Sequence, residues 1–215
     1  MKTFTTIGLA AFSIAVAAAY PARAGPFITI QPENGTPFTV TDPGGCGPNG
    51  CIPLGSKGYI SGGVGDGQTA PDLVLTPGTY RFTYVGHGDA VDHDTFTVGA
   101  NTIHWYDPIG ANFVYTVTAA GDLPFAYANL TTGYSISDSA FSPIQNLAYG
   151  LFFGPKPGIA YIGLTDLPYP GDHDFQDLGI RISIPESPTW AMMLVGFAGL
   201  GYAAFHRARA RPVIA

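Results

Sequence analysis

Residues 79–85 read Thr-Tyr-Arg-Phe-Thr-Tyr-Val, and this stretch decides the fold class. Its aromatic side chains, Tyr80, Phe82 and Tyr84, occupy every second position and alternate with polar or small residues. Because successive side chains of a β-strand point to opposite faces of a sheet, the spacing predicts a strand with one buried aromatic face and one solvated face. Residues 76–79 read Thr-Pro-Gly-Thr and predict a tight turn that joins this strand to the preceding one as a hairpin.

Short runs of the same kind recur from Gly25 to Ile184, separated by Gly, Pro, Asn and Asp turn signals. We expect strands at 38–41, 72–75, 79–85, 95–98, 102–106, 113–118, 125–128, 148–153, 159–164 and 179–184. Many short strands of this kind predict an all-β domain over 25–184, a β-sandwich or jelly roll, with a closed barrel as the alternative. The Ser-rich stretch from Tyr134 to Gln145 is expected to form a surface loop.

The composition excludes several classes of protein. The 215 residues are 46% hydrophobic and 13% aromatic, which is too apolar for a disordered chain. The 29 glycines and 19 prolines follow no triplet period, so the chain is not collagen-like. From Gly25 to Ile184 there are 4 basic and 14 acidic residues, a net charge of −10. Because this acidity would repel phosphate backbones, we expect no nucleic-acid partner.

The first 24 residues have the three parts of a secretory signal peptide. Lys2 supplies a positive start, residues 7–19 form an uncharged and mostly apolar run, and residues 22–24 read Ala-Arg-Ala, a small-x-small cleavage site. We therefore predict a signal peptide over 1–24, export by the Sec machinery and a mature chain that begins at Gly25. A buried N-terminal helix is the alternative.

Export bears on the two cysteines of the chain, Cys46 and Cys51, which lie in a loop rich in Gly and Pro. Disulfides form in oxidising compartments, and the four intervening residues allow a tight closure, so we predict a disulfide between them. Closing so short a loop would contribute about 2 kcal/mol. Free thiols and a zinc site are the alternatives, although no second cysteine pair or nearby histidine completes a zinc set.

Residues 185–215 differ in character from the predicted β domain. They begin with a proline-containing motif, Pro185, Glu186, Ser187 and Pro188. Residues 189–205 then carry no charge, and the tail over 206–215 is basic through Arg207, Arg209 and Arg211. Because the 17 uncharged residues would rise about 26 Å as a helix, near the lower limit for crossing a bilayer, we predict a transmembrane helix there. The arginines would place the tail in the cytoplasm and the β domain outside; a buried amphipathic helix is the alternative.

This order of motif, apolar helix and basic tip resembles the PEP-CTERM sorting signal of Gram-negative bacteria. The family's motif is usually Pro-Glu-Pro, whereas here Ser187 precedes Pro188. The resemblance implies cleavage near the motif by exosortase, a membrane-embedded cysteine transpeptidase. It also implies a protein anchored in the inner membrane before processing and then passed to the cell surface or an exopolysaccharide matrix. The same tail is attached to many unrelated exported domains, so it is an address and implies no activity.

A weaker resemblance lies upstream, where residues 172–178 read Asp-His-Asp-Phe-Gln-Asp-Leu and are similar to a segment that precedes the sorting tail in many exported β proteins. Asp172, Asp174 and Asp177 bring three carboxylates onto one loop, and such oxygen ligands are typical of calcium sites, so Ca²⁺ is a candidate cofactor. The spacing is not that of an EF-hand. The alternative is that these aspartates cap their own backbone in turns.

A second polar cluster could hold a transition metal, but its two imidazoles lie six residues apart, and we expect solvated turn residues instead. Its members are His87, Asp89, Asp92, His93 and Asp94.

Catalysis has little support in the sequence. There is no Gly-x-Ser-x-Gly elbow and no phosphate-binding Gly-Lys-Ser/Thr loop, and Glu33 is the only glutamate in 25–184. We therefore predict a structural, adhesive or glycan-binding surface protein rather than an enzyme. It would touch exopolysaccharide through Trp105, Tyr106 and nearby tyrosines, because aromatic faces stack on sugar rings, unless these rings belong to the core. The alternative function is a matrix-glycan hydrolase that uses aspartates as acid and base.

Overall fold

The structure, a computed structural model, describes residues 25–32, 36–46, 48–61, 70–88, 93–137, 147–165, 174–185 and 189–209. The predicted signal peptide over 1–24 lies outside these residues. Several predicted site residues also lie outside them, namely Asp172, Glu186, Ser187, Pro188 and Arg211.

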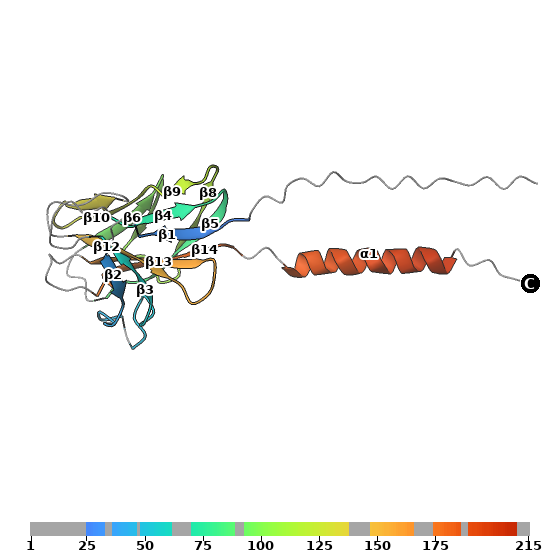
Figure 1. The fold of residues 1–215 in the computed structure, drawn as a ribbon, viewed down its shortest axis with the longest axis horizontal. Coiled ribbons are helices and arrows are strands. Elements are labelled where there is room, and N and C mark those ends of the chain that lie inside the picture. The colour runs from blue at the N-terminus through green and yellow to red at the C-terminus, as the bar shows by residue number, and fades with distance from the viewer. Residues whose placement is uncertain are drawn as a thin grey trace, which may run out of the picture.

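The described residues form fourteen β-strands and one helix (Figure 1). The strands are β1 (Ile28–Gln31), β2 (Thr36–Thr39), β3 (Lys57–Ile60), β4 (Asp72–Leu75), β5 (Gly78–Gly86), β6 (Asp94–Val98), β7 (Asn101–His104), β8 (Asn112–Val117), β9 (Gly121–Asp122), β10 (Phe125–Asn129), β11 (Ser135–Ser137), β12 (Ala148–Phe153), β13 (Ile159–Thr165) and β14 (Leu178–Ser183), and the helix is α1 (Thr189–Arg209). All described strand pairs are antiparallel. The predicted all-β class is therefore confirmed.

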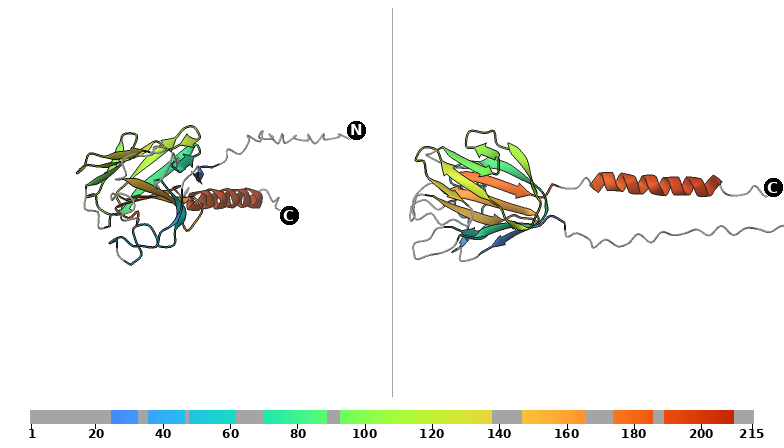
Figure 2. Two further views of the ribbon diagram at one scale, coloured as in Figure 1. Left: turned by 60° about the vertical axis from the view of Figure 1, so that its left-hand side comes forward. Right: turned by 90° about the horizontal axis from the view of Figure 1, so that it is seen from above.

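The strands form three sheets (Figure 2). The largest has seven strands in the order β2-β3-β12-β13-β14-β5-β8. A second has the order β11-β10-β6-β7, and a third the order β1-β4-β9. Buried side chains from all three sheets share one hydrophobic core, so the two smaller sheets pack against one face of the seven-stranded sheet.

Strand β5 supplies the centre of this core, as its alternating pattern predicts. Tyr80, Phe82 and Tyr84 are fully buried. The ring of Phe82 stacks on Phe113 of β8, with centroids 5.1 Å apart, and faces Phe96 of β6 at 6.0 Å. Burial of one large apolar side chain is worth about 1.5–3 kcal/mol, so the three rings of this strand contribute strongly to the burial energy of the core.

The other face of the seven-stranded sheet is covered by a smaller apolar cluster. It is built from Val40, Ile52, Ile60, Phe152, Tyr161 and Phe175. Val85 of β5 packs against this cluster, and Thr83 is buried, whereas Thr79 and Arg81 are exposed. The predicted solvated face of β5 is thus exposed only along its first half, because the loop that carries the cysteines covers the second half.

The predicted hairpin at 76–79 is wrong. Strand β4 pairs with β1 and β9, whereas β5 pairs with β14 and β8, so the turn carries the chain from one sheet to another. Gly78 is already the first residue of β5 and packs against Pro26, where a Cβ would lie 2.5 Å from the proline Cβ. The Tyr80 hydroxyl lies 2.7 Å from the Thr76 carbonyl oxygen and 2.9 Å from that of Phe27, and its single proton can be donated to either, so it ties this corner together.

The ten predicted strands all exist, with ends that move by up to two residues. Four strands were not predicted, namely β1, β3, β9 and β11, which are two to four residues long. The predicted loop over Tyr134–Gln145 is wrong in part, because β11 lies within it and its Ile136 is buried in the main core. Residues 138–145 lie outside the described residues.

The side chains of helix α1 that the structure describes from Met193 to Tyr202 are exposed. A helix over 189–205 is therefore confirmed. In the part of the chain that the structure describes, however, no helix is long and apolar enough to cross a membrane, so the transmembrane prediction is not supported. The physical reason is that the run is short for a bilayer and contains three glycines and a tyrosine. The side chains of Arg207 and Arg209 are outside the description.

Candidate functional site

The two ends of the seven-stranded sheet differ in what they carry. Strand β5 finishes at Gly86, which pairs with Gly179 at the start of β14. Near its other end Arg81 pairs with Ser183, where β14 leaves toward the C-terminal segment. Figures 1 and 2 show that the first strand, β1, begins on the same side of the domain as the last strand, β14, ends. The Gly86 end therefore lies opposite the exit of the chain.

Three histidines and two aromatic residues gather at the Gly86 end, and we name them the histidine-aromatic cluster. His87 follows β5, His93 precedes β6, and His104, Trp105 and Tyr106 lie at the end of β7. These are the three histidines, of five in the chain, whose side chains the structure describes. They meet because β6 and β7 pair with each other and pack across the core from β5.

Trp105 forms the centre of the histidine-aromatic cluster. The imidazole of His93 stacks parallel on its ring, with centroids 4.5 Å apart and an angle of 7°. His87 meets the same ring edge-on at 5.6 Å. A second stack pairs His104 with Tyr106 at 4.9 Å and 10°. Trp105 is half-buried, whereas Tyr106 is 64% exposed.

Backbone hydrogen bonds hold this cluster in place. The Trp105 carbonyl accepts from the buried Tyr84 hydroxyl at 2.8 Å, and the Trp105 N–H donates to the Asp94 carbonyl at 3.0 Å. The Asp107 carboxylate accepts from the His104 N–H at 2.8 Å and so closes the turn after β7. Burial, followed by the carboxylates of Asp107 and Asp94, raises the pKa of Tyr84 well above its usual range. The phenol therefore stays protonated and remains a donor to Trp105.

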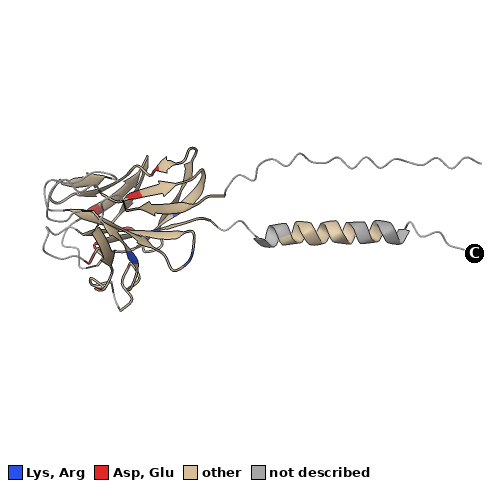
Figure 3. Ribbon diagram, in the orientation of Figure 1, with Lys and Arg blue, Asp and Glu red and all other residues tan. Residues whose placement is uncertain are grey.

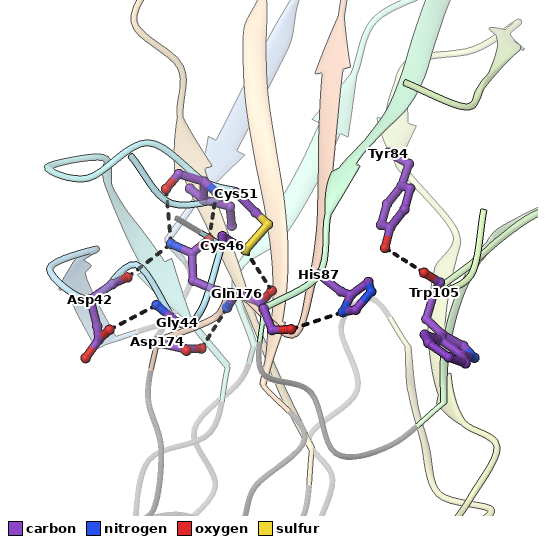
Figure 4. The surroundings of a disulfide bond; sticks show 11 residues. Asp42, Gly44, Cys46, Cys51, Tyr84, His87, Trp105, Asp174 and Gln176 are labelled. Atoms are coloured by element: carbon purple, nitrogen blue, oxygen red, sulfur yellow. Dashed lines mark hydrogen bonds between the residues drawn. A yellow bond between two sulfur atoms is a disulfide. The ribbon is translucent and has the colours of Figure 1, made fainter. Parts of the chain in front are cut away.

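The predicted disulfide joins Cys46 and Cys51, with their Cα atoms 5.2 Å apart (Figure 4). Its loop lies beside the Gly86 end of the sheet. A Cβ at Gly86 would lie 2.8 Å from the Cys51 sulfur, and one at Gly179 would lie 3.3 Å from the Cys51 Cβ. Both strands can therefore approach the disulfide only because they carry glycine at these points.

Gln176 connects the disulfide loop to the cluster, and its side chain is fully buried. Its Oε1 accepts from the Ile52 N–H at 2.7 Å, and its Nε2 donates to the carbonyls of Ile52 at 3.1 Å and Asp42 at 3.2 Å. Its backbone carbonyl accepts from the Gly88 N–H at 2.8 Å, next to His87. One residue thus ties together three segments that are far apart in the sequence (Figure 4).

The residue before it, Phe175, is the only non-glycine residue with positive φ, 59°, in the described ranges. A left-handed conformation costs a residue of this size about 1–3 kcal/mol, so the surrounding packing must hold it. The Phe175 ring packs against Phe38 at 5.1 Å and Phe152 at 5.9 Å. This corner directs Phe175 into the smaller apolar cluster while Gln176 points into the cysteine loop.

The three aspartates predicted to bind calcium have different outcomes. Asp172 lies outside the described residues, and Asp174 and Asp177 are each 3% exposed. Asp174 accepts from the Gln176 N–H at 2.8 Å, which is the turn-capping role of the alternative interpretation. Gly44 lies so close to this carboxylate that a Cβ would overlap it. Among the residues that the structure describes, no group of three His, Cys, Asp or Glu side chains could hold a metal ion, and the calcium prediction stays untested.

The second polar cluster of the sequence analysis is brought together only in part. Asp89 and Asp92 lie outside the described ranges. His87 and His93 are exposed, as expected of turn residues, yet both contact Trp105. Asp94 differs from the expectation because it is fully buried as the first residue of β6.

Sequence reasoning missed His104 as a member of the cluster. It also extended the strand through Tyr106, whereas β7 ends at His104. The dipeptide Asp107-Pro108 could have predicted the end of this strand, because Asp before Pro favours the start of a turn.

No lysine or arginine belongs to the cluster. The four basic residues of 25–184 are all described, and they lie on other parts of the strands and turns (Figure 3). They are Lys57, Arg81, Lys156 and Arg181. The arrangement therefore offers open aromatic surface together with imidazole groups that can form hydrogen bonds. Comparison of the chain with protein-family models, curated proteins and solved structures found no match.

Proposed function

We propose that the protein is an exported surface or matrix protein whose β domain, a β-sandwich or jelly roll, binds extracellular polysaccharide through the histidine-aromatic cluster. The observation that carries this proposal is the ring of Tyr106, which is 64% exposed and backed by the parallel imidazole of His104. An exposed aromatic ring can pack on the apolar face of a sugar. Because its neighbours already hold this ring, binding would lose little side-chain entropy.

The position of the cluster supports a role at a surface. It follows the Gly86 end of β5, whereas the chain leaves the domain near Arg81, at the other end of this strand. Five residue steps of strand, at about 3.3 Å each, separate Gly86 from Arg81 by about 17 Å. A protein held by its C-terminal segment would therefore present the cluster away from the point of attachment.

We propose the same address for the protein that the PEP-CTERM resemblance implies. Export through the Sec machinery would be followed by association with the inner membrane, recognition of 185–188 by exosortase, and release to the surface or an exopolysaccharide matrix. Two features support this proposal. The Cys46–Cys51 disulfide suits an oxidising compartment, and α1 exposes Leu194, Val195 and Phe197 as apolar surface that a membrane could cover.

A glycan array tests the binding proposal. The purified chain should bind a subset of polysaccharides, and Tyr106→Ala should lose that binding without a change in folding, because Tyr106 is exposed. Phe153→Ala is the matched control, because Phe153 is an exposed aromatic residue on β12 at the opposite end of the sheet. Equal binding by wild type and Tyr106→Ala, or no binding by either, would contradict the proposal.

A matrix-glycan hydrolase stays the alternative. Such an enzyme needs two carboxyl groups that face each other across a sugar-binding groove. The carboxyl groups that influence Tyr84 are those of Asp107, which holds the His104 N–H, and of Asp94, which is fully buried. Neither observation favours catalysis over glycan binding.

A further inference from the structure

The cluster restricts which carbohydrates could dock on it, because its two aromatic rings are not equally available. Trp105 has the imidazole of His93 stacked on its ring and that of His87 against it. Tyr106 has one parallel partner, His104, and keeps 64% of its surface exposed. A sugar could therefore reach Tyr106 without rearrangement, whereas stacking on Trp105 from the side of His93 would require this imidazole to move.

The angle between the two rings also restricts which carbohydrates could bind. The planes of Trp105 and Tyr106 are inclined by 81°, with centroids 6.0 Å apart. A flat, crystalline polysaccharide presents many sugar rings in one plane and needs coplanar aromatic rings to contact several of them at once. Rings that are almost perpendicular cannot do so. A single flexible chain, in contrast, can offer one sugar ring to Tyr106 and bend away from Trp105.

The polar groups around Tyr106 suit a neutral sugar. The Nδ1 atom of His104 is buried and has no hydrogen-bond partner within the described residues. The other ring nitrogen, Nε2, could serve a sugar hydroxyl as a hydrogen-bond donor or acceptor. No lysine or arginine belongs to the cluster, and the carboxylate of Asp107, which accepts from the His104 N–H, disfavours an anionic ligand.

We propose that the histidine-aromatic cluster binds one neutral pyranose ring of a soluble, single-chain polysaccharide, stacked on Tyr106, and does not bind crystalline or acidic polysaccharides. This inference rests on the proposed glycan-binding function and narrows its ligand class. Tyr106 supplies the stacking surface, His104 fixes the orientation of that ring from behind, and Trp105 forms a wall that blocks a second coplanar contact.

Affinity electrophoresis and pull-down with the full chain test the inference. The probes are soluble neutral polysaccharides (dextran, laminarin, galactomannan), soluble acidic ones (alginate, polygalacturonate) and insoluble crystalline ones (microcrystalline cellulose, α-chitin). We expect retention by at least one neutral soluble probe and none by the other two groups. Tyr106→Ala should weaken this retention at least tenfold, whereas Tyr106→Phe, which keeps the ring, and the control Phe153→Ala should stay within twofold of wild type.

The possible outcomes separate this inference from the function on which it rests. Preferential binding to cellulose, chitin or an acidic polysaccharide that depends on Tyr106 would overturn the ligand class and leave glycan binding in place. Loss of binding in Tyr106→Phe as well as in Tyr106→Ala would show that the hydroxyl carries the contact and would overturn the stacking geometry. Retention by none of the probes would overturn both the ligand class and the proposed function.

Discussion

Replacement of Gln176 by leucine should destabilise the domain strongly although the two side chains have similar size. The substitution removes three hydrogen bonds of 2.7, 3.1 and 3.2 Å that the buried amide makes to Ile52 and Asp42. The N–H and carbonyl of Ile52 would then be left in a buried site without this partner. Each such group costs about 1–3 kcal/mol, and the added apolar surface returns part of this, so we expect a net loss of about 3 kcal/mol. In a domain of this length that corresponds to a fall in Tm of roughly 6–12 °C.

Urea unfolding of the purified chain measures the loss, and amide hydrogen exchange locates it. The Ile52 N–H should be protected in wild type and exchange much faster in Gln176→Leu. Gln31→Leu is the matched control, because Gln31 is an exposed glutamine on β1, and its substitution should change the stability by no more than about 0.5 kcal/mol. If Gln176→Leu unfolds at the wild-type urea concentration with Ile52 still protected, Gln176 does not tie the cysteine loop to the sheet.

Gln176→Glu gives a second test of the same reasoning through pH. A carboxylate could still accept from the Ile52 N–H, but it would face the carbonyl oxygens of Ile52 and Asp42. Burial and these carbonyls should raise the pKa of the new carboxyl above its unfolded value of about 4.3. A carboxyl whose pKa is raised in the folded state favours folding below its unfolded pKa, and this contribution to stability is lost as the pH rises through the folded pKa. The variant should therefore be closer to wild type at pH 4 than at pH 7, and an equal deficit at both would refute the assignment of Nε2 as the donor.

Four further predictions concern other parts of the chain. The double substitution Cys46→Ser and Cys51→Ser should lower the free energy of unfolding by about 2 kcal/mol. Thiol alkylation of the folded, unreduced wild type should give no label, and stoichiometric labelling would contradict the disulfide. The raised pKa of Tyr84 contributes stability below about pH 10, and this contribution is lost as the pH rises above that value. In an ultraviolet titration, Tyr84→Phe should therefore lack one phenol that ionises only at high pH in wild type, and identical curves would contradict this. Mass spectrometry should find a shortened C-terminus only in cells that contain exosortase, and intact C-termini in both strains would reject the sorting proposal. The calcium prediction requires a higher Tm in Ca²⁺ than in chelator for wild type but not for Asp174→Asn, and equal wild-type curves would leave the aspartates as turn residues.

The sequence was sufficient for ten of the fourteen described strands, because their signal is local. Alternation along 79–85 predicts which side chains of β5 enter the core, and the runs at β4 and β12 match the structure at both ends. The short strands β9 and β11 were missed because two or three residues do not establish a period of two. The turn at 76–79 was misassigned for a different reason. A tight turn has the same local sequence whether it joins neighbours in one sheet or carries the chain to another sheet.

The candidate site could be predicted only where its members are adjacent in the sequence. Trp105 and Tyr106 could be predicted as a binding surface because they are adjacent aromatic residues. Whether their rings are accessible to a ligand depends on His93 and His104. The registers of β6 with β7 bring these imidazoles into place, and no local pattern encodes that pairing. The role of Gln176 could not be predicted, because it lies among aspartates in the sequence and nothing near it indicates that its amide reaches Ile52, 124 residues away.

The direction of two paired strands links the candidate site to the proposed address. β5 and β14 are antiparallel neighbours, so the end at which β14 leaves the domain is the end at which β5 begins. The histidine-aromatic cluster follows the other end of β5 and is held there by the Tyr84 hydroxyl on the Trp105 carbonyl and by the Gln176 carbonyl on the Gly88 N–H. Had the same residues followed β14, they would lie beside the segment that leads to α1, where a membrane or a processing enzyme would compete with a polysaccharide for access. The pairing of these two strands would therefore allow the chain to carry the proposed C-terminal address and the proposed binding surface without either obstructing the other.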